Sequence, residues 1–125
     1  MSSNDFLKKK SAFSDFIGIT TQDEGKSFLL KIEEHHLNSH GSAHGGVVFT
    51  LADRAFARSV NTAGKTAVAM EMKINYLLPA MKGDVLVARS HVIKEGKRTT
   101  VCLIEVTRGE EKVAILLATA FNIRK

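Results

Sequence analysis

HHLNSHGSAHGGVVFTLADRAFARSV, residues 35–60, joins a loop rich in histidine and glycine to a long apolar segment. The apolar part predicts a helix over residues 46–61, because its hydrophobic side chains recur at intervals of three and four residues. The first apolar stripe holds Val48, Leu51, Ala52, Ala55 and Ser59, the second Phe49, Phe56 and Val60, and the polar side Thr50, Arg54, Arg58 and Asn61. A helix with two apolar stripes needs cover on two sides, so we expect it to be largely buried.

The segments before this helix predict shorter elements. Residues 28–35, FLLKIEEH, are typical of a first strand, and residues 17–22 can pair with them across a turn. Residues 4–16 carry apolar side chains at helical spacing beside three exposed lysines, which indicates a short amphipathic helix.

After the helix the hydrophobic period changes to two residues. A strand over residues 68–78 ends at Pro79, and we expect three more strands over residues 84–93, 99–107 and 112–123. Short turns join the last three, so these should be antiparallel neighbours. The buried helix, which precedes this run of strands, must then lie across one face of the sheet. The sequence therefore predicts an α+β fold.

The composition fits one domain over residues 1–125. The net charge of +5 and the pI of about 9.5 allow an anionic partner, although surplus lysine also serves solubility. One tyrosine, no tryptophan and no arginine-rich tract argue against nucleic acid. The single cysteine, Cys102, fits a core side chain and a reducing, cytoplasmic compartment. We expect neither a membrane span nor a signal peptide, because no apolar run is long enough and none follows the first lysines.

Three interpretations of the loop before the helix are open: a metal site, an anion-binding loop, or a loop that is only rich in histidine. His36, His40 and His44 are spaced by four residues and would share one face of a helix. The Asn, Ser and Gly residues between them are typical of a loop, and no second acid or cysteine nearby completes a ligand set. We therefore expect no metal and no cofactor.

Gly45 and Gly46 lie where the loop enters the helix. The first N–H groups of a helix have no internal partner and carry partial positive charge, so they can stabilise an oxyanion. Glycine lets a ligand approach such N–H groups closely. The alternative is that both glycines only form a tight corner.

Asp53 is the acid inside the apolar segment. The positions four residues away are Phe49 and Ala57, so no basic side chain pairs with it along the helix. A partly buried carboxylate is costly, and burial raises its pKa toward values suited to a general base. The alternative is an acid at the edge of the core that reaches water or pairs with Arg89 or Lys73 across the fold.

These residues together resemble the hotdog-fold acyl-CoA thioesterases, in particular the phenylacetate-degradation (PaaI-type) branch. The resemblance rests on N-x-x-G-x-x-H-G-G followed by LAD, with Asn38, Gly41, residues 44–46 and residues 51–53 in the matching positions. VAMEMKINYLLPA (68–80) and KEGKRT (94–99) are similar to later family segments, so the likeness extends from Asn38 to the C-terminus.

The resemblance implies an antiparallel sheet wrapped around one long helix, and metal-free hydrolysis of acyl-CoA by homodimers or dimers of dimers (homotetramers). It implies that Asp53 is the general base or nucleophile and that the Gly45 N–H binds the thioester carbonyl oxygen. His44 would support the loop and contact the carbonyl or the leaving thiol, and Asn38 would position substrate or water. Gly46 would belong to the same substrate-binding loop.

Three further parts of the chain are candidates for the same site. Ala69 replaces a hydroxyl residue that holds the attacking water in many relatives. Met70 belongs with Phe49, Phe56 and Met72 to a candidate acyl pocket, although these residues also fit a plain core. Lys94, Lys97 and Arg98 form a basic turn that fits either the phosphates of CoA or a solvated hairpin tip.

The spacing of Gly46 and Asp53 also bears on assembly. Seven residues of helix separate them, or about 10 Å, which is too far for one helix to serve both ends of a thioester. Two antiparallel helices related by a two-fold axis solve this, with Asp53 from one subunit and the Gly45 loop from the other. Two competing functions are an acyl-CoA-binding regulatory module and a hydratase or dehydratase, whose acid and histidine arrangement this sequence does not show.

Overall fold

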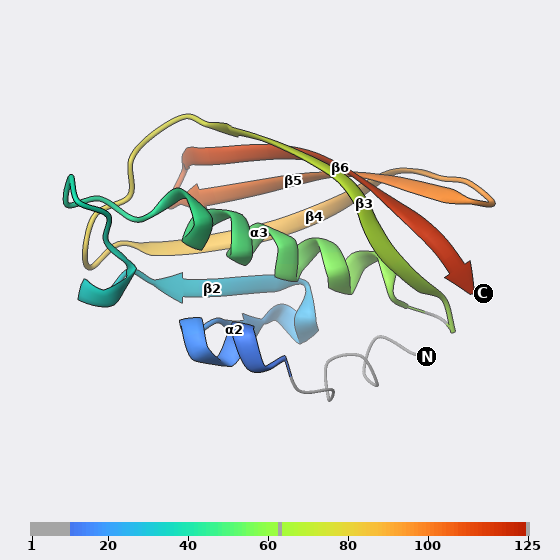
Figure 1. Cartoon of the computed structure of the whole chain (residues 1–125), viewed down its shortest axis with the longest axis horizontal. Coiled ribbons are helices and arrows are strands. Elements are labelled where there is room, and N and C mark those ends of the chain that lie inside the picture. Colours follow the sequence, from blue (N-terminus) through green and yellow to red (C-terminus); the bar gives the residue numbers. More distant parts are fainter. Residues whose placement is uncertain (1–10, 63, 125) are drawn as a thin grey trace.

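The computed structural model describes residues 11–62 and 64–124 (Figure 1). Its elements in chain order are α2 (Ala12–Ile17), β1 (Thr20–Gln22), η1 (Asp23–Gly25), β2 (Ser27–Lys31), η2 (Glu34–His36), α3 (Gly45–Val60), β3 (Thr66–Tyr76), β4 (Val85–Glu95), β5 (Thr99–Arg108) and β6 (Glu111–Arg124). The helix expected over residues 4–16 lies mostly outside the described residues; within them it is α2.

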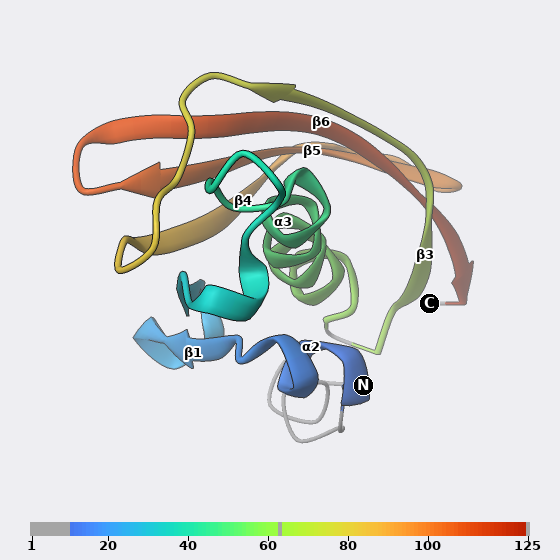
Figure 2. The ribbon, with the colours of Figure 1, turned by 60° about the vertical axis from the view of Figure 1, so that its left-hand side comes forward.

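One antiparallel sheet of six strands, in the order β1-β2-β4-β5-β6-β3, curves around α3 (Figures 1 and 2). The predicted meander of the last three strands is confirmed, as is the helix lying across one face. β3 is not a neighbour of β4; it crosses over and pairs with β6 at the sheet edge, from Thr66↔Arg124 to Tyr76↔Ala114. The expected α+β architecture, a sheet wrapped around one long helix, is therefore present.

The core lies between α3 and the concave face of the sheet. Both predicted apolar stripes of α3 are confirmed, since Leu51, Ala52 and Phe56 are at most 1% exposed. Cys102 on β5 is buried and unpaired, as its strand pattern predicts. No helix within residues 11–62 and 64–124 combines the length and the apolar content needed to cross a membrane.

The two N-terminal strands are shorter than predicted. The strand expected over residues 28–35 ends at Lys31, because the next residues form the turn η2. His36 causes this turn: its buried ring accepts the Glu33 N–H at 2.9 Å and bonds the Ile17 carbonyl at 2.8 Å. The strand expected over residues 17–22 is reduced to β1, because α2 occupies the chain as far as Ile17.

The prediction that Asn61 lies on the polar side of the helix is wrong. Asn61 lies at the end of α3, where it is buried and only 9% exposed. Its Oδ1 accepts the Ala67 N–H at 2.9 Å, and its Nδ2 donates to the Ala57 and Ala67 carbonyls at 2.8 and 3.2 Å. Asn61 therefore ties the end of α3 to the first residues of β3, which explains its burial.

Candidate active site

The N-terminus of α3 presents one free backbone donor. The Nδ1 of His44, the N-cap, accepts the Gly46 N–H at 2.8 Å, so the ring proton of neutral His44 is on Nε2. The Gly45 N–H, in contrast, has no acceptor among the described residues. Of the two glycine N–H groups predicted to face substrate, the Gly45 N–H is thus available and the Gly46 N–H is engaged.

Tyr76 is a site residue that the sequence alone did not reveal. Its hydroxyl donates to the Gly45 carbonyl at 2.8 Å, which fixes the start of α3 against the end of β3. A Cβ on Gly45 would lie 2.9 Å from this oxygen, so a side chain at position 45 would displace the Tyr76 hydroxyl. The one available signal was that the chain has a single tyrosine, at the end of an alternating strand.

Asn38 organises the loop that precedes α3. Its Oδ1 accepts the backbone N–H groups of His40 at 2.9 Å and Ser42 at 3.1 Å. Its Nδ2 donates to the Ser42 Oγ at 3.2 Å. Because an amide nitrogen carries two hydrogens, one donor of Asn38 is left for a ligand.

A pocket of about 330 Å³ brings part of the predicted site together. Its walls are Asn38, Ser42, Ala43, Gly45, Val48, Tyr76, Leu77, Leu78, Pro79 and Ala80. Asn38 and Gly45 therefore share one cavity at the helix N-terminus. The other predicted residues are not part of its walls: His44, Gly46, Asp53, Ala69, Met70, Lys94, Lys97 and Arg98.

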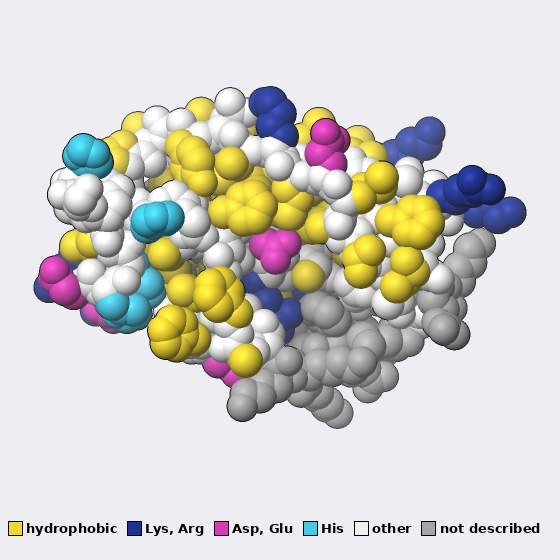
Figure 3. All heavy atoms as spheres, viewed as in Figure 1, with side chains coloured by type: hydrophobic (Ala, Val, Ile, Leu, Met, Phe, Trp, Pro, Cys, Tyr) yellow, Lys and Arg dark blue, Asp and Glu magenta, His cyan; other side chains and the backbone are white. Residues whose placement is uncertain are grey.

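Asp53 lies in the third turn of α3, half-buried and without a hydrogen bond or salt bridge among the described residues. Burial raises its pKa, and the positive charge of neighbouring Arg54 opposes the rise. The alternative partners are engaged elsewhere: Arg89 with Asp23 at 3.5 Å and Lys73 with Asn75 at 2.8 Å. Hydrophobic side chains gather over this face of the molecule (Figure 3).

The basic turn lies at the far end of the molecule. Lys97 and Arg98 are exposed in the β4–β5 turn, which Asn122 fastens through bonds to the Gly96 and Arg98 carbonyls. This turn and the loop before α3 are at opposite ends of the long axis (Figure 1), and cationic side chains gather at the end that carries the turn (Figure 3). Lys94, on β4, is also exposed.

The candidate acyl-pocket residues differ in their exposure to solvent. Phe56 is a core side chain, 1% exposed, whereas Met70 on β3 is 60% exposed. Phe49 and Met72 are partly buried against the core. Ala69 is exposed opposite Ala120, beside an irregularity in the pairing of β3 and β6.

Two of the three histidines considered as metal ligands bond to backbone groups. Both ring nitrogens of His36 are bonded to backbone groups, and Nδ1 of His44 is bonded to Gly46. No group of three His, Cys, Asp or Glu side chains in the described part of the chain is arranged to hold a metal ion.

Comparisons with known proteins place this geometry in a family. The sequence profile of the thioesterase superfamily matches residues 40–115. The chain belongs to the thioesterase superfamily. Among superfamily members, it is 40% identical over 101 residues to the acyl-coenzyme A thioesterase PaaI of Escherichia coli, covering 80% of this chain and 72% of that protein.

Solved structures of relatives agree with the fold. The E. coli PaaI protein from the phenylacetic acid degradation operon has a TM-score of 0.87 at 34% identity, covering 97% of this chain and 91% of that one. A Streptococcus mutans UA159 protein bound to acetyl CoA has a TM-score of 0.76 at 31% identity, covering 79% and 81%. The expected hotdog fold, PaaI-type relationship and class of thioester hydrolase are confirmed.

The raised pKa of Asp53 predicts a stability effect. Because the folded-state pKa of Asp53 lies above its ordinary value of 3.8, the folded protein binds more protons than the unfolded chain between the two pKa values. Stability is then lost as the pH rises through that window. Asp53→Asn should therefore raise the melting temperature at pH 7 by a few degrees, and the gain should vanish below pH 3.8. Glu110→Gln, at an exposed turn, is the control; a lower melting temperature for Asp53→Asn would show a stabilising partner.

Proposed function

We propose that this protein hydrolyses acyl-CoA thioesters at two sites shared between the subunits of a homodimer. The observation that carries the proposal is Asp53, a half-buried carboxylate with a raised pKa and no hydrogen-bond or salt-bridge partner among the described residues. Such a group is suited to act as a base or nucleophile near neutral pH. The relatives named acyl-CoA thioesterases, and the relative bound to acetyl CoA, support the substrate class.

The separation of the functional groups supports a shared site. Eight residues of helix separate Gly45 from Asp53, or about 12 Å, and Asp53 is not in the walls of the pocket that holds Gly45. Both groups must act on one carbonyl, which requires distances near 3 Å. A second subunit supplies the missing half: its Gly45 loop serves the Asp53 of the first.

The edge strand β3 offers the dimer contact. It runs for 11 residues and pairs on one side with β6, and among the described residues no strand covers its other side. Val68 and Met70 on this strand are 50% and 60% exposed. A long apolar edge strand invites pairing with another strand. Antiparallel pairing of β3 with its copy sets the two α3 helices side by side and antiparallel.

A second contact surface accounts for a dimer of dimers. Leu117 and Phe121 alternate with the buried residues of β6, so they point away from α3, and they are 50% and 41% exposed. Apolar side chains on this outer face of the sheet favour contact with another dimer. The homotetramer is therefore built from two different interfaces.

The chemistry then assigns one role to each group. The Gly45 N–H donates to the carbonyl oxygen, which becomes an oxyanion when the carbonyl carbon is attacked. Asp53 of the other subunit either removes a proton from the attacking water or attacks the carbon itself, with water cleaving the resulting anhydride. The C–S bond breaks, and the thiolate of CoA takes up a proton. The Nδ2 of Asn38 and the Nε2–H of His44 orient the water and the leaving group.

Ala69 favours one alternative function. A methyl group cannot hold the attacking water as the hydroxyl of many relatives would, and Ala69 is exposed on β3. A protein that binds acyl-CoA with little turnover is therefore the second candidate. Turnover and binding, measured on the same samples, separate the two functions.

Thiol release from fatty acyl-, phenylacetyl- and hydroxybenzoyl-CoA tests the proposal. Wild type should release CoA from at least one of them. Asp53→Asn should lower kcat by at least about 100-fold while retaining acyl-CoA binding, because it removes the base but not the pocket. Glu110→Gln, at an exposed turn, is the control. Turnover near that of wild type in Asp53→Asn would exclude Asp53, and binding without turnover in wild type would select the second candidate.

The basic turn should contribute to substrate affinity. Replacing Lys97 and Arg98 with Ala should raise KM for CoA esters by about threefold or more with little change in kcat, because phosphate contacts are equal in the ground and transition states. Steady-state kinetics at low salt measures the effect. Lys112→Ala, an exposed cation elsewhere, is the control. An unchanged KM would mean that the turn is only a solvated hairpin tip.

A further inference from the structure

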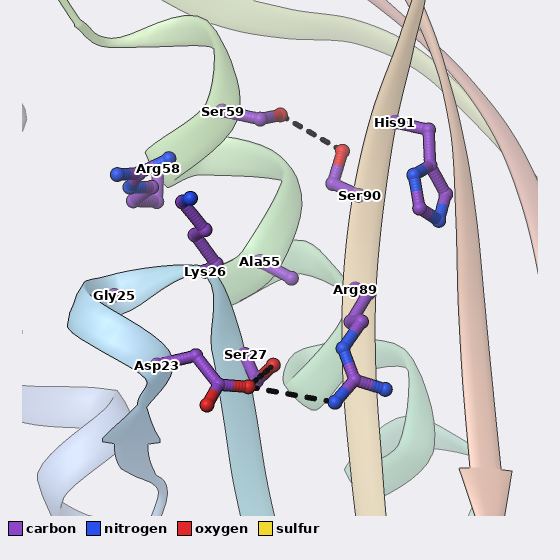
Figure 4. Close-up of a pocket in the computed structure, with 10 residues that line it drawn as sticks. All are labelled: Asp23, Gly25, Lys26, Ser27, Ala55, Arg58, Ser59, Arg89, Ser90 and His91. Carbon is purple, nitrogen blue, oxygen red and sulfur yellow. Dashed lines mark hydrogen bonds and ion pairs between the residues drawn. The ribbon is translucent and has the colours of Figure 1, made fainter.

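A second pocket lies on the side of α3 away from Asp53. Its volume is about 460 Å³, and its walls come from η1, β2, α3 and β4: Asp23, Gly25, Lys26, Ser27, Ala55, Arg58, Ser59, Arg89, Ser90 and His91 (Figure 4). At 100° per residue, Arg58 projects about 140° around the helix from Asp53, and Ser59 about 120°. This pocket is therefore separate from the thioester site.

One polar atom in this pocket is buried without a partner. The Nε of Arg58 is inaccessible to solvent and has no hydrogen-bond partner among residues 11–62 and 64–124. Arg58 and Lys26 both line the pocket (Figure 4), and no acid among the described residues pairs with either. A buried donor without a partner is costly. A bound anion removes this cost.

The hydroxyl groups and the one acid of the pocket are already bonded. The Ser59 hydroxyl donates to the Phe56 carbonyl at 2.8 Å and lies 2.8 Å from the Ser90 hydroxyl. The Asp23 carboxylate accepts from the Ser27 hydroxyl at 2.8 Å and pairs with Arg89, so it does not neutralise Arg58. Lys26 and Arg58 are therefore the cations of the described walls that no acid pairs with, and a ligand that meets them must offer acceptors.

We propose that this pocket binds a small organic anion through a phosphate or carboxylate group held by Arg58 and Lys26. Hydrogen bonds from a charged guanidinium to a phosphate or carboxylate are stronger than hydrogen bonds between neutral groups. The planar guanidinium of Arg58 can donate two parallel hydrogen bonds to such an anion. The pocket is several times larger than a bare oxyanion, so the ligand also has an organic part, which packs beside Ala55. Binding does not depend on Asp53 and does not rest on the hydrolysis proposed above.

Titration followed by ¹H–¹⁵N NMR tests the site directly, because the Arg58 Nε–H gives its own signal. The probes are inorganic phosphate, glycerol phosphate, succinate and adenosine 3′,5′-bisphosphate, the last representing the nucleotide end of CoA. At least one should shift the Arg58 Nε–H and the Ser59 and Ser90 amides saturably, with Kd near or below ~1 mM. Saturation by the bisphosphate alone would identify CoA as the source of the anion. No saturable shift with any probe would overturn the proposal.

Paired variants separate a built site from general charge attraction. Lys26→Met with Arg58→Met should weaken binding by about tenfold or more. Lys31→Met with Lys112→Met removes the same charge elsewhere and should leave Kd unchanged. Equal weakening in both pairs would mean non-specific attraction and overturn the site. If the first pair fails to fold, Arg58→Lys replaces it, because this variant keeps the positive charge but lacks the Nε–H group and should also weaken binding. The titration of the wild-type protein does not depend on any variant.

Discussion

Burial of α3 is the constraint on which the rest of the structure depends. The helix carries small and apolar side chains on two sides, and the curved sheet covers them, with Leu51 and Ala52 wholly inaccessible to solvent. Its two ends are then fixed by polar side chains that other elements provide. Tyr76 holds the Gly45 carbonyl at the start, and Asn61 joins the end of α3 to β3. Because Gly45 and Asp53 lie on this one continuous helix, they remain about 12 Å apart.

That rigid separation explains why function is proposed to require two chains. Asp53 is the one acid on α3, whose other residues are apolar or basic apart from Thr50 and Ser59. Its burial raises its pKa, which favours proton transfer but disfavours the charged form in the folded state. The free Gly45 N–H lies at the other end of the same element. Two antiparallel copies of α3 bring these complementary groups together without any movement within a subunit.

The helix and most strands could be predicted from the spacing of hydrophobic residues in the sequence. Residues 46–61 repeat every three to four positions and form α3 within one residue of the expected bounds, and the strands from residue 68 onward are also found. The motif around His44 and Gly45 identified the family because few sequences combine those residues. Asp53 was singled out by its apolar neighbours, and its half-burial agrees.

Interactions between distant parts of the chain could not be predicted from the same patterns. The pairing of β3 with β6, the bond from Tyr76 to Gly45 and the burial of His36 all join residues far apart in sequence. Asn61 fits a polar helical face by spacing, but β3 covers it. Arg58 looked like a solvated cation, although its Nε is buried. The hydrophobic periodicity of a helix or strand shows which of its sides is apolar. It does not show which other element packs against that side.

Subunit exchange tests the central claim, the shared site, most directly. Asn38→Asp keeps the oxygen that accepts the His40 and Ser42 N–H groups but loses the amide donor, and Asp53→Asn loses the base. Each variant alone should be inactive. After mixing and exchange, half of the dimers are mixed and each has one intact site, so activity should return to about one quarter of wild type. If mass spectrometry confirms mixed dimers and no activity returns, the site is built within one chain and the account is wrong.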